Sequence, residues 1–407
     1  MKAGALSHLR VLDLSRILAG PLAAQILGDL GAEVIKVEQP GAGDEIRKWG
    51  PPYLAGAGEG PRDSVYFLVG NRNKKSVTVD LTRPEGQELV RALAARCDVL
   101  VENFKVGGLA RYGLDYPSLR AENPRLVYCS ITGFGQDGPY ARRAGYDALI
   151  QAMGGLMNVT GLPDGQPGGG PTKVGVPISD ILTGLYAVGA ILAAIAHREI
   201  SGAGQYVDLA LLDCQVASLA NQGLSALHTG KAPGRIGNDH PNVVPYRDFP
   251  TADGHVLIAV GSDAQFARFA EIAGHPEWAR DPRFLTNADR ARHRDVLVPL
   301  VREATRTRTT RAWVEALEPE GVPCGPIYTV PELFSDPQVE ARGMKTTMEH
   351  AVAGTIPLIA SPIRLSETPV SYRLPPPTLG QHTREVLRDL LGVDGERLRR
   401  LEERGVV

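Results

Sequence analysis

Strand-like and helix-like patterns alternate through the first third of this 407-residue chain, and this alternation constrains the fold more than any other feature. The strand patterns are short, apolar and rich in β-branched residues, and helix patterns at 20–27 and 84–95 separate some of them. Strands separated by helices form βαβ units, so we predict an α/β fold with a parallel sheet covered on both faces. The predicted strands are 11–14, 33–38, 76–80, 99–101 and 126–131.

A parallel sheet of this kind binds its ligands at the carboxyl ends of the strands. After the first strand the chain reads SRILAGP rather than GxGxxG, so we expect no nicotinamide dinucleotide cofactor. The glycines at 165–170 are followed by Pro171, Thr172 and Lys173, which do not supply the Lys-Ser/Thr pair of a phosphate-binding P-loop.

The composition narrows the possible partners. A net charge of −2 gives no electrostatic footprint for nucleic acid. The four cysteines are far apart and the histidines occur singly, which indicates buried free thiols in a reducing cytoplasm and no metal site. The first ten residues lack the apolar stretch of a signal peptide. The longest apolar run, 181–196, is shorter than the ~20 residues that span a bilayer, so we expect no membrane segment.

The middle of the chain changes in character. Strand patterns at 244–249 and 255–260 are joined by a turn at 252–254 and followed by helix patterns, which is typical of a smaller α+β domain. We therefore predict a large domain made of residues 1–223 and 326–407 and a small domain made of residues 224–325.

Asp180 is the candidate catalytic residue with the clearest local context. It follows the Gly/Pro-rich stretch 163–177 and directly precedes the apolar run 181–196, which we predict to be a packed helix. A carboxylate at a helix N-terminus meets free backbone N–H groups and the positive end of the helix dipole. The local pattern also fits a purely structural N-cap.

Several segments, taken together and in order, resemble the family III CoA-transferases. They begin with LDLSRILAGP at 12–21 and run through VENF at 101–104, AGYDA at 144–148 and VGVPISDILTGLYA at 174–187. Further matches are at 27–52, 71–81, 130–143, 237–246, 321–327 and 379–383. Within the family, the sequence is most similar to enzymes that use succinyl-CoA as donor and a dicarboxylate such as glutarate as acceptor.

The resemblance implies a fold and a chemistry. The large domain would be Rossmann-like, built from both ends of the chain with the small domain inserted, and two chains would interlock as a homodimer. Asp180 matches the family's nucleophile, which forms an acyl–aspartyl anhydride and then an aspartyl-CoA thioester. The resemblance implies that CoA and acyl-CoA are substrates and that no cofactor is bound permanently.

Positions that bind CoA in the family also carry over. Arg111 matches a phosphate-binding arginine, which suits the guanidinium group. Where a relative has an arginine after the second strand this chain has Gln39, and Lys36, Arg47, Lys74 and Lys75 are candidates to supply that charge. The residues that match the CoA site are Leu18, Ala19, Val79, Asp80, Asn103, Phe104, Lys105, Arg111, Tyr146 and Asp147.

A dicarboxylate acceptor has a second carboxylate that is costly to bury without a partner. Arg16 and Arg47 are candidates to pair with it, because both lie in matched segments, although an arginine at a strand end also forms structural salt bridges. His240 is a third substrate-binding candidate, from the small domain.

Three alternatives share these features. An α-methylacyl-CoA racemase of the same fold has His where this chain has Tyr146, and tyrosine is a much weaker base near neutral pH. An intramolecular CoA transfer within a C5 dicarboxylate would use the same nucleophile. A non-catalytic CoA-binding protein would have no need of Asp180.

Overall fold

A computed structural model describes residues 4–56 and 63–407 of the chain. Residues 1–3, which open the segment examined for a signal peptide, lie outside the described part. The described chain divides into two compact units, one formed by 1–157, 173–231 and 338–407 and the other by 158–172 and 232–337. Each unit is described below by itself.

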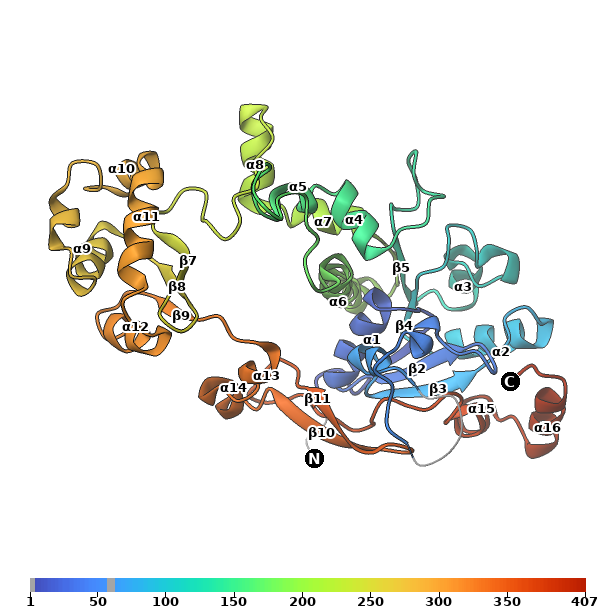
Figure 1. Cartoon of the computed structure of the whole chain (residues 1–407). Helices are drawn as coiled ribbons and strands as arrows, with labels where there is room; N and C mark the ends of the chain where they lie inside the picture. Colours follow the sequence, from blue (N-terminus) through green and yellow to red (C-terminus); the bar gives the residue numbers. More distant parts are fainter. Residues whose placement is uncertain (1–3, 57–62) are drawn as a thin grey trace. The chain divides into compact units, whose positions relative to one another are not determined.

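The first unit is built on a six-stranded parallel sheet with the strand order β3-β2-β1-β4-β5-β6, which confirms the predicted α/β class (Figure 1). This order has its switch point between β1 and β4, the position where open α/β sheets bind ligands. The sixth strand was not predicted, and it lies at the sheet edge beside β5. The strands are β1 (Arg10–Asp13), β2 (Glu33–Glu38), β3 (Lys74–Thr78), β4 (Val99–Glu102), β5 (Val127–Thr132) and β6 (Tyr206–Ala210).

Helices cover both faces of this sheet, because successive strand residues point to opposite sides. Val11 and Val34 pack with the helices of one face, and Leu12 and Ile35 pack with those of the other. The first face carries α1 (Ala19–Asp29), α4 (Asp147–Met153), α6 (Ile178–Ser201) and α7 (Leu211–Ala217). The second face carries α2 (Pro84–Ala94), α3 (Tyr116–Glu122), α15 (Thr383–Leu391) and α16 (Gly395–Glu403).

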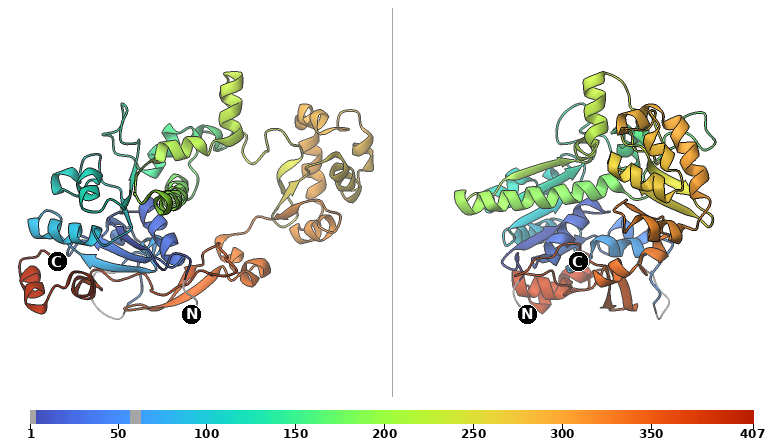
Figure 2. Two further views of the ribbon diagram at one scale, coloured as in Figure 1. Left: turned by 180° about the vertical axis from the view of Figure 1, so that it is seen from behind. Right: turned by 90° about the vertical axis from the view of Figure 1, so that its left-hand side faces the viewer.

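Helix α6 is the long green helix beside the sheet in the right-hand view of Figure 2. Among the described residues it is the helix that is long and apolar enough to cross a membrane, with a mean hydropathy of 1.9 over its best window. Its residues Ala187, Ile191 and Ala194 are buried in the same core as α1 and β5. A Cβ atom on Gly184 would lie 2.9 Å from the Ala19 carbonyl oxygen, so this glycine permits α6 to lie close to the start of α1.

The remaining elements of the first unit are short. The antiparallel pair β10 (Lys345–His350) and β11 (Gly354–Ile359) shares a small core with the loop after β2. The single-turn and surface helices are η1 (Glu45–Lys48), η2 (Val65–Gly70), η3 (Ala110–Tyr112) and α8 (Ala220–Thr229). Helices α5 (Leu156–Val159) and α14 (Pro337–Ala341) contain residues of both units.

The second unit contains a three-stranded antiparallel sheet and has its own core around Trp313 and Phe269. The predicted pairing of 244–249 with 255–260 is confirmed, since β7 and β8 form an antiparallel pair. Its strands are β7 (Tyr246–Pro250), β8 (His255–Ala259) and β9 (Cys324–Pro326). Its helices are α9 (Asp263–Ile272), η4 (Pro276–Arg280), α10 (Asn287–Arg292), α11 (Arg294–Thr305), α12 (Thr310–Leu317) and α13 (Val330–Leu333).

Candidate active site

Asp180 is the third residue of α6, and the interpretation of this residue as the N-cap is wrong. The helix begins at Ile178 and Pro177 stands at the N-cap. The Pro177 side chain has no oxygen that could accept a backbone N–H, so it does not cap the helix. The cap comes instead from α4, because Oδ1 of Asp147 accepts the backbone N–H of Ser179 at 2.8 Å and that of Asp180 at 3.4 Å. The side chain of Asp180 is therefore free of a capping role.

A buried polar network supports this arrangement. The Gln151 side-chain amide donates to Oδ2 of Asp147 at 2.7 Å and accepts the Val174 N–H at 2.8 Å. The Ser179 hydroxyl donates to Oε1 of Gln215 at 2.8 Å. The side chains of Gln151, Ser179 and Gln215 are fully buried, so their hydrogen bonds are costly to break and fix the start of α6.

The electrostatics around Asp180 oppose the expectation that the helix N-terminus keeps this carboxyl ionised. Burial and, to a smaller extent, the neighbouring Asp147 carboxylate raise the pKa of Asp180 to about 7. Burial together with the carboxylates of Asp180 and Asp147 also raises the pKa of Tyr66, which places this phenol near both acids. Trp49 packs against Tyr66 with ring centroids 6.1 Å apart. Neither aromatic residue was predicted as part of the site.

Asp180 lines a pocket of about 170 Å³ at the carboxyl ends of β1, β4 and β5, the edge where the sequence predicts ligand binding. Gly133 and Gly145 approach so closely that a Cβ on Gly133 would lie 2.6 Å from the Gly145 Cα, and this contact brings Tyr146 to the pocket. The predicted site residues that line it are Arg16, Ala19, Asn103, Phe104, Lys105, Tyr146 and Asp180. Arg142 and Arg143 line it too and were not predicted.

A second pocket of about 260 Å³ shares Arg16 and Phe104 with the first. Val79 and Asp80, which the sequence predicts as CoA-binding residues, line this second pocket together with Gln39. Two other predicted contacts lie elsewhere: Leu18 is buried, and Arg111 is exposed with its guanidinium 4.5 Å from the Tyr112 ring centroid. The lysines proposed to compensate for Gln39 pair internally, although Lys36 also lines this pocket together with Lys48.

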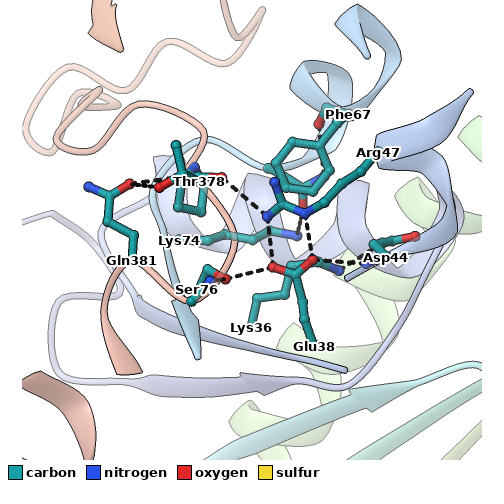
Figure 3. Close-up of polar contacts among 12 residues, drawn as sticks. Lys36, Glu38, Asp44, Arg47, Phe67, Lys74, Ser76, Thr378 and Gln381 are labelled. Carbon is teal, nitrogen blue, oxygen red and sulfur yellow. Dashed lines mark hydrogen bonds and ion pairs between the residues drawn. The ribbon is translucent and has the colours of Figure 1, made fainter. Parts of the chain in front are cut away.

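Arg47 is committed to an internal ion pair, as Figure 3 shows. Its Nε and Nη2 donate to the two carboxylate oxygens of Glu38 at 2.8 Å each, and Nη1 donates to Asp63 at 2.7 Å. The guanidinium also lies 3.7 Å from the Phe67 ring centroid, and the residue is buried. The structure therefore matches the salt-bridge alternative, and Arg47 presents no free fork to a substrate.

The other two acceptor candidates differ in their surroundings. Arg16 is half-exposed, lines both pockets, pairs with Glu45 at 3.1 Å and lies 4.9 Å from the Phe104 ring centroid. Its buried Nε has no hydrogen-bond partner within the described part of the chain. His240 belongs to the second unit, where its Nδ1 accepts two backbone N–H groups and its ring stacks on Tyr246.

Within the described residues, no group of three or more His, Cys, Asp or Glu side chains is placed to hold a metal ion. The site consists instead of the Asp180 carboxyl group with its raised pKa, the neighbouring acid Asp147, aromatic rings and several cationic side chains. Such an arrangement suits covalent catalysis by a carboxylate on an anionic substrate.

The chain belongs to the family III CoA-transferases, since the model of that family matches residues 6–383. A succinate–glutarate CoA-transferase from Agrobacterium fabrum is 49% identical over 95% of each chain. The human succinyl-CoA:glutarate CoA-transferase is 41% identical over 99% of this chain and 90% of its own. A crystal structure of a CaiB/BaiF family protein from Brucella suis is 47% identical, with a TM-score of 0.85 over 96% of this chain and 100% of that one.

Proposed function

We propose that this CoA-transferase moves CoA from succinyl-CoA to a small dicarboxylic acid, with Asp180 as the nucleophile. The observation that carries the proposal is the Asp180 carboxyl group in a pocket rimmed by Lys105, Arg142 and Arg143. The similarity to enzymes named for succinate and glutarate supports the choice of donor and acceptor.

The reaction proceeds through covalent intermediates on Asp180. Its carboxylate attacks the donor thioester, the C–S bond breaks, and a mixed anhydride forms as CoA thiolate leaves. The thiolate then attacks the aspartyl carbonyl of the anhydride, which releases succinate and leaves an aspartyl-CoA thioester. The acceptor carboxylate attacks that thioester and expels the thiolate, which finally attacks the acceptor carbonyl and restores Asp180.

The ionised form of Asp180 starts this sequence, so its raised pKa sets the pH at which the free enzyme becomes reactive. A carboxylate with a higher pKa is also the better nucleophile once it is ionised, because nucleophilicity rises with basicity. The cationic rim attracts the anionic substrates and pairs with the charge that they bring to the pocket.

Arg16 is the acceptor-binding residue that we retain from the sequence, and Arg142 and Arg143 join it as candidates for the distal carboxylate of the acceptor. We keep His240 as a further substrate-binding proposal.

We also propose that the folding domains are 1–223 with 326–407, and 224–325.

We further propose an interlocked homodimer in the cytoplasm, with no nucleic acid or membrane partner. The outer face of α6 supports the dimer, since its apolar side chains Leu185 and Ile200 are 51% and 90% exposed. Coverage by a second chain would remove this apolar surface from water.

CoA exchange followed by mass spectrometry tests the function. Wild type and Asp180→Ala are mixed separately with succinyl-CoA and a panel containing glutarate, itaconate, mesaconate, malate and oxalate. We expect a new acyl-CoA with wild type and a loss of about 10³-fold or more with the variant. Full exchange by Asp180→Ala would refute the mechanism. Interconversion of (R)- and (S)-2-methylacyl-CoA without exchange would favour the racemase, and a CoA shift within one C5 acid would favour the intramolecular reaction.

A further inference from the structure

The turn that joins β1 to α1 contains a backbone conformation that its residue type disfavours. Ile17 has a φ of 69°, in the left-handed region, although it is β-branched and lacks the freedom of glycine. Such a conformation persists only where surrounding groups hold it, and it occurs often at functional sites. The turn lies at the active-site pocket, because Arg16, Ile17 and Ala19 line it together with Asp180.

Asn103 holds the residue before Ile17 by both of its backbone groups. Oδ1 of Asn103 accepts the Arg16 N–H at 2.9 Å, and Nδ2 donates to the Arg16 carbonyl oxygen at 2.7 Å. A single side-chain amide therefore fixes the peptide units on either side of Arg16. These bonds use one of the two amide hydrogens and one of the two oxygen lone pairs of Asn103.

The buried ion pair of Lys36 and Asp44, two residues labelled in Figure 3, also holds the turn. Oδ1 of Asp44 accepts the Ile17 N–H at 3.1 Å, and Oδ2 of Asp44 accepts a hydrogen bond from Nζ of Lys36 at 2.9 Å. The same ammonium group donates to the Ser15 carbonyl oxygen at 2.8 Å. Both Asp44 and Lys36 are buried, so water cannot readily replace them as partners of the turn.

The turn is also set against the helix that carries the nucleophile. The Ala19 carbonyl oxygen lies so close to Gly184 of α6 that a Cβ there would be 2.9 Å away. A change of φ at Ile17 would rotate the chain that follows, moving the backbone of Leu18 and Ala19 relative to Asp180. Displacements of about 1 Å at such positions cost as much as about 10²-fold in rate.

We propose that Asn103 is a positioning residue of the transfer reaction. It keeps Ile17 in the left-handed conformation and thereby holds the Arg16–Ala19 backbone in register with Asp180 and the bound thioester. This inference rests on the proposed function for its effect on rate, whereas the coupling between Asn103 and Ile17 is a property of the folded chain. The resemblance places Asn103 at the CoA site, and this inference adds that its side chain acts on the turn.

The test compares Asn103→Ala in three backgrounds: wild type, Ile17→Gly and Ile17→Ala. Glycine adopts a positive φ without penalty, whereas alanine removes most of the isoleucine side chain and keeps the penalty. We expect Asn103→Ala to lower kcat about tenfold or more in the wild-type and Ile17→Ala backgrounds, and about threefold or less with Ile17→Gly. The KM for succinyl-CoA should change by less than about threefold in each background, because the side chain acts on the turn and not on CoA.

Thermal unfolding of the same variants gives a reading that needs no activity. Asn103→Ala should lower the Tm by about 2 °C less in the Ile17→Ala background than in the Ile17→Gly background, because relaxation of the strained turn recovers part of the lost free energy. Equal effects of Asn103→Ala in all three backgrounds, or a loss confined to KM, would overturn the inference. If Asn103→Ala does not fold, Asn103→Asp replaces it, since it keeps the acceptor for the Arg16 N–H and loses the donor.

An inactive wild type would refute the proposed function and leave the Tm comparison to decide the coupling. An active wild type whose variants show no dependence on the residue at 17 would refute the positioning role alone.

Discussion

A buried and a half-buried carboxyl group in the first unit, Glu38 and Asp180, have opposite electrostatic surroundings. Glu38 at the end of β2 accepts two hydrogen bonds from Arg47 and one from the Ser76 hydroxyl (Figure 3). Burial alone would raise its pKa, but these partners lower the pKa of Glu38 to about 2. Asp180 has the acid Asp147 as its charged neighbour instead, and burial with this like charge raises its pKa to about 7.

The difference separates a structural carboxylate from a reactive one. The charge of Glu38 is neutralised by a bidentate partner and lies in a network that holds the chain together, so ionisation is favoured and permanent near neutral pH. Asp180 has no such counter-ion among the residues that the structure describes, and its pKa of about 7 places it close to half ionisation at neutral pH. A site that must form and break bonds to a carboxylate benefits from the second arrangement.

The largest expected effect on stability follows from removing the counter-ion of Glu38. Arg47→Met leaves a buried carboxylate without its partner, which costs about 3–5 kcal/mol in the free energy of unfolding. The measurement is the denaturation midpoint in urea at pH 8. The matched variant Asp180→Asn should keep or raise this midpoint, because it replaces a carboxylate whose ionised form is disfavoured in the folded state.

A second change at the same pair separates charge from packing. Adding Glu38→Leu to Arg47→Met removes the unpaired charge and should recover part of the lost midpoint. If Arg47→Met and wild type unfold at the same urea concentration, the ion pair contributes nothing to stability. Glu38 and Asp180 would then differ in geometry and not in the stabilising effect of a counter-ion.

The acid stability of the fold gives the next prediction. The folded pKa of Glu38 lies below its ordinary value of 4.5, so its contribution is complete above about pH 4.5 and is lost as pH falls toward 2. The contribution amounts to about 3 kcal/mol, because the pKa falls from 4.5 to about 2 and each pKa unit corresponds to about 1.4 kcal/mol. The Arg47→Met/Glu38→Leu double variant lacks this contribution, so its unfolding free energy should decline less steeply between pH 4.5 and pH 2. A slope equal to that of wild type would contradict the assignment.

The parallel sheet and the position of Asp180 at the start of a helix could be predicted because both depend on local sequence patterns. Alternating strand and helix patterns identify βαβ units, and a carboxylate before an apolar run marks the start of a helix. No such local pattern predicts the partners of Asp180. Asp147 was expected at the site only through the resemblance, and its bond to the start of α6 and the bonds of Gln151 and Gln215 exist only because other helices pack there.

The roles of the arginines were likewise undetermined. Arg47 and Arg16 both stand in matched segments, yet Glu38 and Asp63 occupy Arg47 while Arg16 faces both pockets. The positive φ of Ile17 could not be predicted at all, since a β-branched residue is among the least expected in that conformation. Such departures from local preference concentrate where the chain is shaped for a site.

The smallest predicted effect concerns the pH dependence of the reaction. Since Asp180 must be ionised, kcat/KM should rise with pH along an acidic limb near pH 7 in wild type. Asp147→Asn removes the like charge and leaves burial, the larger cause, in place. The limb should therefore move to lower pH by less than about one unit and stay above the usual range for aspartate.

The design of this variant keeps the other role of Asp147. The asparagine Oδ1 can still accept the Ser179 N–H, so the start of α6 keeps its cap while the charge and the hydrogen bond from the Gln151 amide are lost. Glu122→Gln, an exposed charge on α3 at the opposite face of the sheet, serves as the control and should leave the limb unchanged. A limb that moves to higher pH with Asp147→Asn would show that Asp147 acts on Asp180 through the geometry of the helix start and not through its charge, and the contrast with Glu38 would then rest on burial alone.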